Sequence, residues 1–199
     1  MCTSPEKYAC RFSRKFGRAL LAVAACAAML AATAAGAQDT GAPAAAGSPV
    51  ASAQVTREER SLMGALAQIN MAEIEAAQLA LEKSASEQLK GFAQLVIDEH
   101  VADLQALRTL AQARGVTLPE EASIRSMSQS VALKMLFGRL FDRQYLKRMG
   151  ISEHQRTLGL LHDALKNTQD PELLALIEKI LPVVQNHLQK ARLISVQPD

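Results

Sequence analysis

Four polar side chains stand where the apolar stripe of a predicted helix should continue, and they are the residues most able to do chemistry. They are Glu73, His100, His154 and His187, one on each of four long helical segments. Burying a carboxyl or imidazole group costs free energy unless the group finds a partner. Counted from the predicted helix ends, all four lie within about two turns of one level along an up-down bundle. The spacing predicts that they meet in the core.

Three imidazoles and one carboxylate can bind Zn²⁺, Cu²⁺ or Fe²⁺, because these borderline ions accept neutral imidazole and carboxylate ligands. Asn70, Asp103 and Tyr145 are expected to support such ligands by hydrogen bonds from behind. The alternative interpretation is a polar network that holds the helices in register and binds no metal. The remaining histidine, His162, lies at the edge of its stripe and is expected at the surface.

Enzymatic motifs are not found at these positions. Di-iron bundles carry Glu-x-x-His on two helices, whereas the residues three before the four histidines are Ile97, Ile151, Gly159 and Val184. No serine lies in the Gly-x-Ser-x-Gly turn of an α/β-hydrolase. The sequence therefore predicts a protein that is not an enzyme.

The elements that must position these side chains are helices, because apolar residues recur every three or four positions and no stretch alternates at period two. The long helices are predicted over 57–82, 85–113, 139–166 and 171–195, with a short one over 122–137 before the third long helix. The fold class is therefore all-α, with the up-down four-helix bundle as the expected architecture.

Local signals mark the predicted helix boundaries. Thr56 with Glu59 and Ser84 with Glu87 fit the capping box, in which a hydroxyl and a carboxylate satisfy free backbone amides. Asp170 precedes a proline at the first helical position, where its missing N–H costs nothing. Gly138 is expected to separate the short helix from the third long one.

The first 37 residues are typical of a secretory signal peptide. A basic stretch is followed by the apolar run 19–35 and by Ala35-Gly36-Ala37, which predicts cleavage before Gln38. The run falls short of the ~20 residues of a membrane-spanning helix. A lipoprotein box ending at Cys26 is the weaker alternative, since the apolar run continues past the cysteine. Periplasmic export is expected, with no transmembrane segment after cleavage.

The rest of the chain divides into a linker and one domain. Residues 38–55 are rich in Ala, Gly, Pro and Ser and are predicted to be a flexible linker, followed by the bundle domain over 56–197. Cleavage removes all three cysteines and leaves 17 basic and 19 acidic residues, a net charge of −2. The domain then has no disulfide. Without a basic patch interleaved with aromatics, nucleic acid is not an expected partner.

An ordered set of short motifs resembles a known family. The motifs are Asn70-x-x-Glu73, Asp98-Glu99-His100, Phe141-Asp142-x-x-Tyr145 leading to His154, and Leu181-Pro182-x-x-x-x-His187. Together they resemble the ferritin-like family of unknown function numbered 4142, over about residues 57–195. The resemblance implies a ferritin-like four-helix bundle in the bacterial envelope and leaves an association with the outer membrane open. It implies no established activity.

The sequence thus supports two functional hypotheses. The favoured one is an exported protein without enzymatic activity, which acts by interaction with an envelope protein or in a stress response. The alternative is a periplasmic metal-binding protein, with a mononuclear or degenerate His/Glu site for Zn, Cu or Fe in the bundle core.

Overall fold

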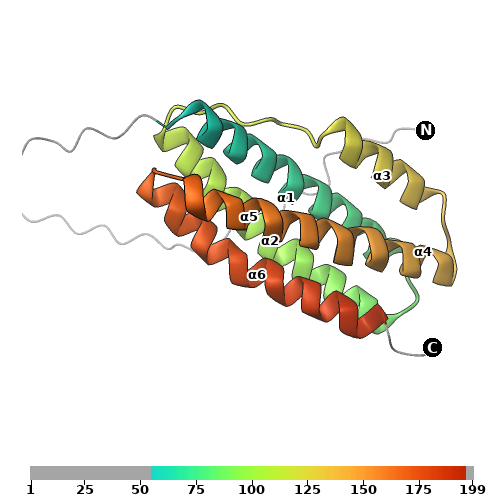
Figure 1. Cartoon of the computed structure of the whole chain (residues 1–199). Helices are drawn as coiled ribbons and strands as arrows, with labels where there is room; N and C mark the ends of the chain where they lie inside the picture. Colours follow the sequence, from blue (N-terminus) through green and yellow to red (C-terminus); the bar gives the residue numbers. More distant parts are fainter. Residues whose placement is uncertain (1–54, 196–199) are drawn as a thin grey trace, which may run out of the picture. The chain divides into compact units, whose positions relative to one another are not determined.

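The computed structural model describes residues 55–195, and every regular element in this range is helical (Figure 1). The elements are α1 (Arg57–Lys83), α2 (Glu87–Ala113), α3 (Ile124–Lys134), α4 (Gly138–Tyr145), the π-helix η2 (Leu146–Glu153), α5 (His154–Asn167) and α6 (Pro171–Ser195). The all-α prediction is confirmed. The predicted signal peptide, and all of the predicted linker except the buried Val55, lie outside the described residues.

The long helices lie side by side, and α4, η2 and α5 follow one another as a single continuous rod (Figure 1). The short helix α3 lies outside this group and packs against α1. None of the helices in residues 55–195 is both long and apolar enough to cross a membrane. The predicted boundaries of the long helices differ from the observed ones by no more than two residues.

The helix starts confirm most of the capping predictions. Thr56 and Glu59 form the expected capping box, with the Thr56 hydroxyl accepting from the Glu59 amide. The prediction for Ser84 is wrong, because α2 begins at Glu87 and its cap is Ser86. Ser84 instead ends α1, donating its N–H to the Ala80 carbonyl while its hydroxyl accepts from the Ser86 amide.

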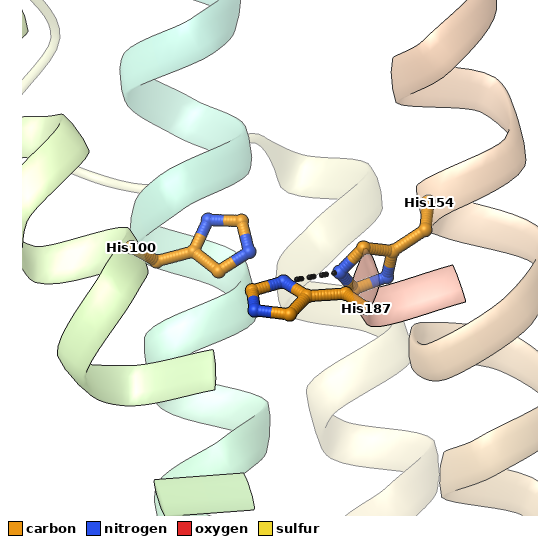
Figure 2. Close-up of side chains that lie close together, drawn as sticks. All are labelled: His100, His154 and His187. Carbon is orange, nitrogen blue, oxygen red and sulfur yellow. Dashed lines mark hydrogen bonds between the residues drawn. The ribbon is translucent and has the colours of Figure 1, made fainter. Parts of the chain in front are cut away.

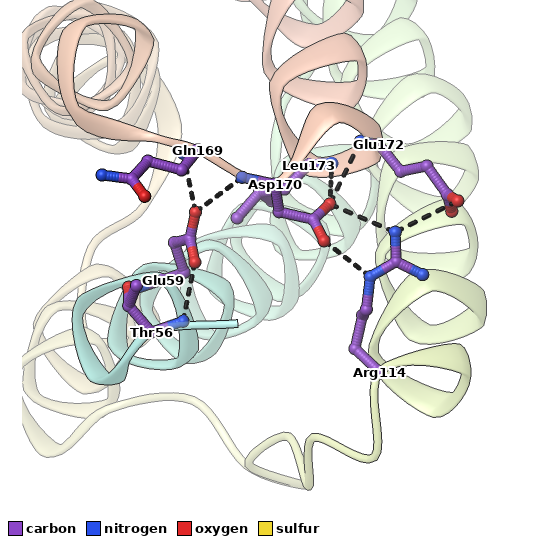
Figure 3. A network of polar contacts seen from close by, with 7 residues as sticks. All are labelled: Thr56, Glu59, Arg114, Gln169, Asp170, Glu172 and Leu173. Atoms are coloured by element: carbon purple, nitrogen blue, oxygen red, sulfur yellow. Dashed lines mark hydrogen bonds and ion pairs between the residues drawn. The ribbon is translucent and has the colours of Figure 1, made fainter. Parts of the chain in front are cut away.

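One end of the molecule is held by buried carboxylates that each satisfy several donors (Figure 3). Glu59 accepts from the Thr56 amide and, through its other oxygen, from the amides of Gln169 and Asp170. Asp170 caps α6 by accepting from its first amides, and it forms a 2.6 Å ion pair with Arg114. Burial raises the pKa of both carboxyls, but the hydrogen bonds from these donors together lower it by more. The pKa of each carboxyl is therefore below its ordinary value. The network joins the starts of α1 and α6 to the end of α2.

Two apolar cores fill the interior, one toward each end of the long helices. The first contains Ala76, Ala77, Leu79, Ala80, Leu89, Phe92, Ala93, Val96, Leu133, Phe141, Tyr145, Leu146, Met149 and Ala191. The second contains Met63, Leu66, Ala67, Leu104, Leu107, Leu110, Ala111, Leu161, Ala164, Leu173, Ile177, Ile180 and Val184. Each of the long helices, and the α4–η2–α5 rod, contributes residues to both cores, and a layer of buried polar residues that includes Asn70, His100 and His187 lies between the two. On α2, for example, His100 lies between Val96 and Leu104.

The third rod departs from the predicted single α-helix. The break at Gly138 is confirmed, since this residue has a φ of +54° and begins α4. Eight residues of π-helix, Leu146–Glu153, then interrupt the α-helical geometry. The wider turn buries Met149 and Gly150 and leaves Ile151, which the predicted stripe included, only partly buried. The six-residue gap from Tyr145 to Ile151 in that stripe fits no α-helical spacing and is its sequence signal.

Candidate metal centre

Three of the four predicted site residues meet in the layer between the two cores. His100 comes from α2, His154 from the start of α5 and His187 from α6, and their rings point toward one another (Figure 2). One nitrogen of each ring lies within 4.8 Å of the others. The ring centroids are 5.2–5.8 Å apart. The exposed fractions are 3%, 2% and 0%, so the group is closed to bulk solvent.

Asn70 on α1 determines which nitrogen of His100 faces the group. The Asn70 side-chain Nδ2 donates to the Leu66 carbonyl at 2.8 Å, which orients the amide. Its Oδ1 then accepts from Nδ1 of His100 at 2.8 Å. Nδ1 therefore carries the proton, and Nε2 of His100 has a free lone pair. This Nε2 is buried without a hydrogen-bond partner.

The π-helix does the same for His154. Nδ1 of His154 donates to the Met149 carbonyl at 2.8 Å, five residues earlier in the chain. A carbonyl only accepts, so Nδ1 is protonated and Nε2 of the neutral ring bears the lone pair. This Nε2 lies 3.2 Å from Nδ1 of His187.

His187 is oriented by a residue that the sequence reasoning missed. Its Nε2 lies 2.5 Å from Oε2 of Glu99 on α2, a side chain with an exposed fraction of 35%. When Glu99 is ionised, Nε2 is the donor and the Nδ1 lone pair of His187 points at His154. Glu99 directly precedes His100 in the sequence, but nothing there shows that it faces α6.

With Glu99 ionised, these three contacts aim three nitrogen lone pairs at one small volume. Two lone pairs 3.2 Å apart repel, so something positive must lie between His154 and His187. A proton on Nδ1 of His187 can serve, either in a neutral ring whose Nε2 accepts from a protonated Glu99 or in a charged ring that donates from both nitrogens. A metal ion can also serve, and it leaves Glu99 ionised. Imidazole ligands in metal sites usually donate their second N–H to a carbonyl or carboxylate in this way.

The three rings are held neutral, which is the form that binds metals. Burial lowers the pKa of His154 to about 4, with a further lowering from His187 and an opposing effect of the Met149 carbonyl. Burial and the nearby Lys190 lower the pKa of His187 to about 4. Burial, followed by the other two histidines, lowers the pKa of His100 well below its ordinary value.

Glu73 lies beside this group rather than among its facing nitrogens. Its Oε1 is 3.7 Å from Nδ1 of His154, the nitrogen turned away from the other two rings. Both Glu73 oxygens are buried without a hydrogen bond. Burial, together with the charge of Glu153, raises the pKa of Glu73 well above its ordinary value. Glu153 is itself buried and ion-paired with Arg156, and the sequence reasoning missed it as well.

The predicted supporting residues have different surroundings. Asn70 contacts His100 directly, as described. The Tyr145 hydroxyl is buried without a hydrogen bond, and burial and the nearby Glu73 raise its pKa. Asp103 is buried one turn beyond Glu99, where burial raises its pKa to about 6 against the opposing charge of Lys179. His162 is exposed, as expected.

Solved structures with a similar fold include copper-binding examples. CopM in the Cu(I)-bound form is 21% identical, with a TM-score of 0.57 over 68% of this chain and 93% of that one. CopM in an Ag-bound form is 22% identical, with a TM-score of 0.57 over 70% and 94%. A DUF305 fragment from Deinococcus radiodurans is 17% identical, with a TM-score of 0.64 over 71% and 97%. At these identities the likeness shows the fold alone.

Sequence comparison identifies the family. No curated protein matches the chain. The family model described as a domain of unknown function, DUF4142, matches residues 44–194. This range includes all of the described helices except Ser195, the last residue of α6. The chain therefore belongs to the DUF4142 family.

Proposed function

We propose that this protein binds one transition-metal ion between His100, His154 and His187, and that copper is the preferred metal. The observation that carries the proposal is the direction of the three lone pairs. Each ring has its other nitrogen bonded to an oxygen, which is Asn70 Oδ1, the Met149 carbonyl or a Glu99 carboxyl oxygen. With Glu99 ionised, none of the three facing nitrogens carries a proton, and one bound cation satisfies all three lone pairs at once.

The geometry suits a three-coordinate ion. Nitrogens that share an ion at about 2.0 Å lie roughly 3.5 Å apart in a trigonal arrangement. The His154–His187 contact is 3.2 Å, and the widest separation in the group is no more than 4.8 Å. Small rotations of the rings therefore bring all three nitrogens into bonding distance.

The ligand type is compatible with copper. Imidazole suits Cu, Zn, Fe and Ni, and Cu(I) does not need the square geometry of Cu(II). The single carboxylate bonded to His187 balances one positive charge. Structures of the similarly folded CopM contain Cu(I), Cu(II) and Ag, which supports a metal of this type here.

We infer that the role is binding rather than catalysis. All three rings are at most 3% exposed, so no substrate reaches the ion while the helices stay packed. If residues 1–37 direct export, as their sequence predicts, the protein holds its metal in the periplasm. The ferritin-like up-down four-helix bundle, with an accessory α3, remains our assignment of the architecture.

Metal content and coordination test the proposal directly. The chain from Gln38 onward, purified without a polyhistidine tag, is expected to retain close to one equivalent of Cu(I) or Ag(I) against a competing chelator. X-ray absorption of the copper-loaded protein is expected to show three nitrogen neighbours at about 2.0 Å. The double variant His100→Ala/His187→Ala is expected to retain none.

The exposed His162 provides the matched control. His162→Ala is expected to retain the metal of the parent protein, and circular dichroism checks whether each variant folds. Because the double variant could lose its fold, the coordination measured in the parent protein stands as the independent test. A parent protein that retains no metal, or that binds it through sulfur or oxygen alone, would contradict the proposal.

A further inference from the structure

Large exposed apolar side chains are concentrated in one short segment. Among residues 55–195 eight such side chains are exposed, and six of them lie between positions 124 and 140. These six are Ile124, Met127, Val131, Met135, Phe137 and Leu140, and we call them the α3 patch. Ile124 and Phe137 have exposed fractions of 84% and 74%. Scattered apolar residues are ordinary at a surface, but a contiguous group of this kind marks an interaction site.

The helical spacing places most of the α3 patch on one face. Ile124, Met127 and Val131 are three and four residues apart, and Met135 follows after four more. Such positions form a stripe along a helix. The inward face of α3 contains Ser130 and Leu133, which are buried. The apolar stripe on the outward face therefore plays no part in the core.

The surroundings of the α3 patch are basic. Residues 55–195 contain 17 basic and 17 acidic residues, but the segment 120–148 contains six basic residues and three acidic ones, and one of the basic residues, Lys134, is paired with Glu75. The segment thus has a net charge of +3, and the remainder of the described chain has −3. Arg125 is exposed beside the stripe, and Arg143 and Lys147 are exposed on the next rod.

A groove shares Leu140 with the α3 patch. It has a volume of about 740 Å³ and lies where α4 and η2 meet the start of α2 and the end of α6. Its lining combines the basic Arg143 and Lys147 and the acidic Asp142 with Leu140, Leu146 and Ile151. Cationic and aliphatic side chains together can contact a phosphate headgroup and the first part of an acyl chain.

We propose that the α3 patch and its basic surroundings dock this protein onto an anionic phospholipid membrane. An exposed aliphatic stripe flanked by Lys and Arg is typical of helices that lie in a membrane interface. A second copy of the chain fits less well, because a two-fold symmetric contact would place one net positive segment against another. The attraction to anionic lipid instead uses that charge.

Vesicle binding tests this proposal. The chain from Gln38 onward is used, since the apolar run 19–35 would itself insert into lipid, and it retains both cores and every described helix. Flotation with vesicles of phosphatidylethanolamine and phosphatidylglycerol is expected to show at least about tenfold tighter binding than with phosphatidylcholine alone. The preference is expected to weaken strongly in high salt, which screens surface charges.

Paired variants locate the contact. Ile124→Ser/Val131→Ser is expected to weaken vesicle binding at least about tenfold, because it removes the aliphatic stripe. Val101→Ser/Leu193→Ser changes the two exposed apolar residues outside the α3 patch, and it is expected to leave binding unchanged. All four side chains are exposed, so both variants should fold, which circular dichroism checks.

Several results would overturn the proposal. They are no binding to anionic vesicles, equal binding to phosphatidylcholine, or an equal loss in the two double variants. A dimer in sedimentation that the Ile124→Ser/Val131→Ser variant abolishes would assign the α3 patch to a second copy instead. The histidines play no part in this assay, so its outcome is independent of the metal proposal.

Discussion

Glu99 controls the histidine group at the scale of single residues, because it decides which nitrogen of His187 carries the proton. Its Oε2 lies 2.5 Å from Nε2 of His187, and the side chain is partly exposed, so it joins the closed site to the surface. Buried imidazoles alone could be arranged with donors facing acceptors. When it is ionised, the Glu99 carboxylate accepts from Nε2 and turns the third lone pair inward.

Replacing Glu99 by Gln therefore tests the role of this charge. The amide oxygen can still accept from His187, but it does not stabilise a bound cation as a carboxylate does. We expect Glu99→Gln to lower the affinity for Cu(I) about 10–100-fold, with little change in melting temperature. Asp98→Asn is the control, since Asp98 is exposed and accepts from Gln94 instead. An equal loss in both variants would reveal only a general effect of charge.

The neutral state of the histidines makes the stability of the metal-free protein depend on pH. In the unfolded chain an imidazole gains its proton near pH 6.5, whereas His154 and His187 in the folded protein gain theirs at about 4. Between these values the unfolded state binds more protons. The free energy of unfolding should therefore decrease as the pH falls from about 6.5 to about 4.

A histidine variant separates the effect of the imidazoles on the pH dependence of stability from that of the carboxyl groups. Some carboxyl groups have raised pKa values, and these groups make the protein more stable as the pH falls. Urea denaturation at several pH values should show that His187→Gln has a smaller slope of stability against pH than the parent protein. The expected difference is up to about 1.4 kcal/mol per pH unit in this interval. Parallel profiles would show that His187 is not held neutral.

At the scale of elements, the π-helix and α6 approach each other closely at Gly150. A Cβ at this position would lie 2.8 Å from the Cβ of Ala191 on α6, closer than two carbon atoms can approach. η2 also supplies the Met149 carbonyl that orients His154. The small residue thus keeps the segment that carries His154 against the helix that carries His187.

We expect Gly150→Ala to lower the free energy of unfolding by about 1–3 kcal/mol, because the added methyl group forces η2 and α6 apart. Gly91→Ala on α2 is the matched control, since a Cβ there meets nothing within 4 Å. In that helix alanine should be neutral or stabilising by up to about 1 kcal/mol. Chemical denaturation measures both, and equal effects would mean that the close approach has no energetic consequence.

At the scale of the whole molecule, the histidine layer joins helices that the two cores hold at their ends. An ion bound by residues of α2, α5 and α6 binds only when these helices are packed together. Such an ion therefore stabilises the folded state by mass action, by about 2.7 kcal/mol when its free concentration is 100 times Kd.

Thermal unfolding with and without Ag(I) measures this linkage. The melting temperature of the parent protein and of His162→Ala should rise with Ag(I) concentration. His100→Ala should lose most of the rise, because it removes one of the three ligands. A rise that is equal in His100→Ala would show that the ion binds elsewhere.

The sequence alone determined the helices, most of their caps and the level at which the polar residues lie. Helical periodicity and capping are local properties, so counting from Ser84 and Asp170 placed His100 and His187 at one height even though the true cap of α2 is Ser86. The motif set also identified the family, which the match over residues 44–194 confirms.

Only the tertiary structure decided which atoms face one another. The rotation of each helix about its axis placed the Glu99 carboxyl group beside His187. It placed Glu73 on the side of the His154 ring that faces away from the other two histidines, although Glu73 lies in the apolar stripe of its helix and Glu99 does not. The irregular gap from Tyr145 to Ile151 signals a break in the α-helical period, but the π-helix and its close approach to α6 at Gly150 are visible only in the structure. The outward α3 patch likewise became visible only when the cores were complete, because an apolar stripe in a sequence does not say which face of a helix the rest of the protein covers.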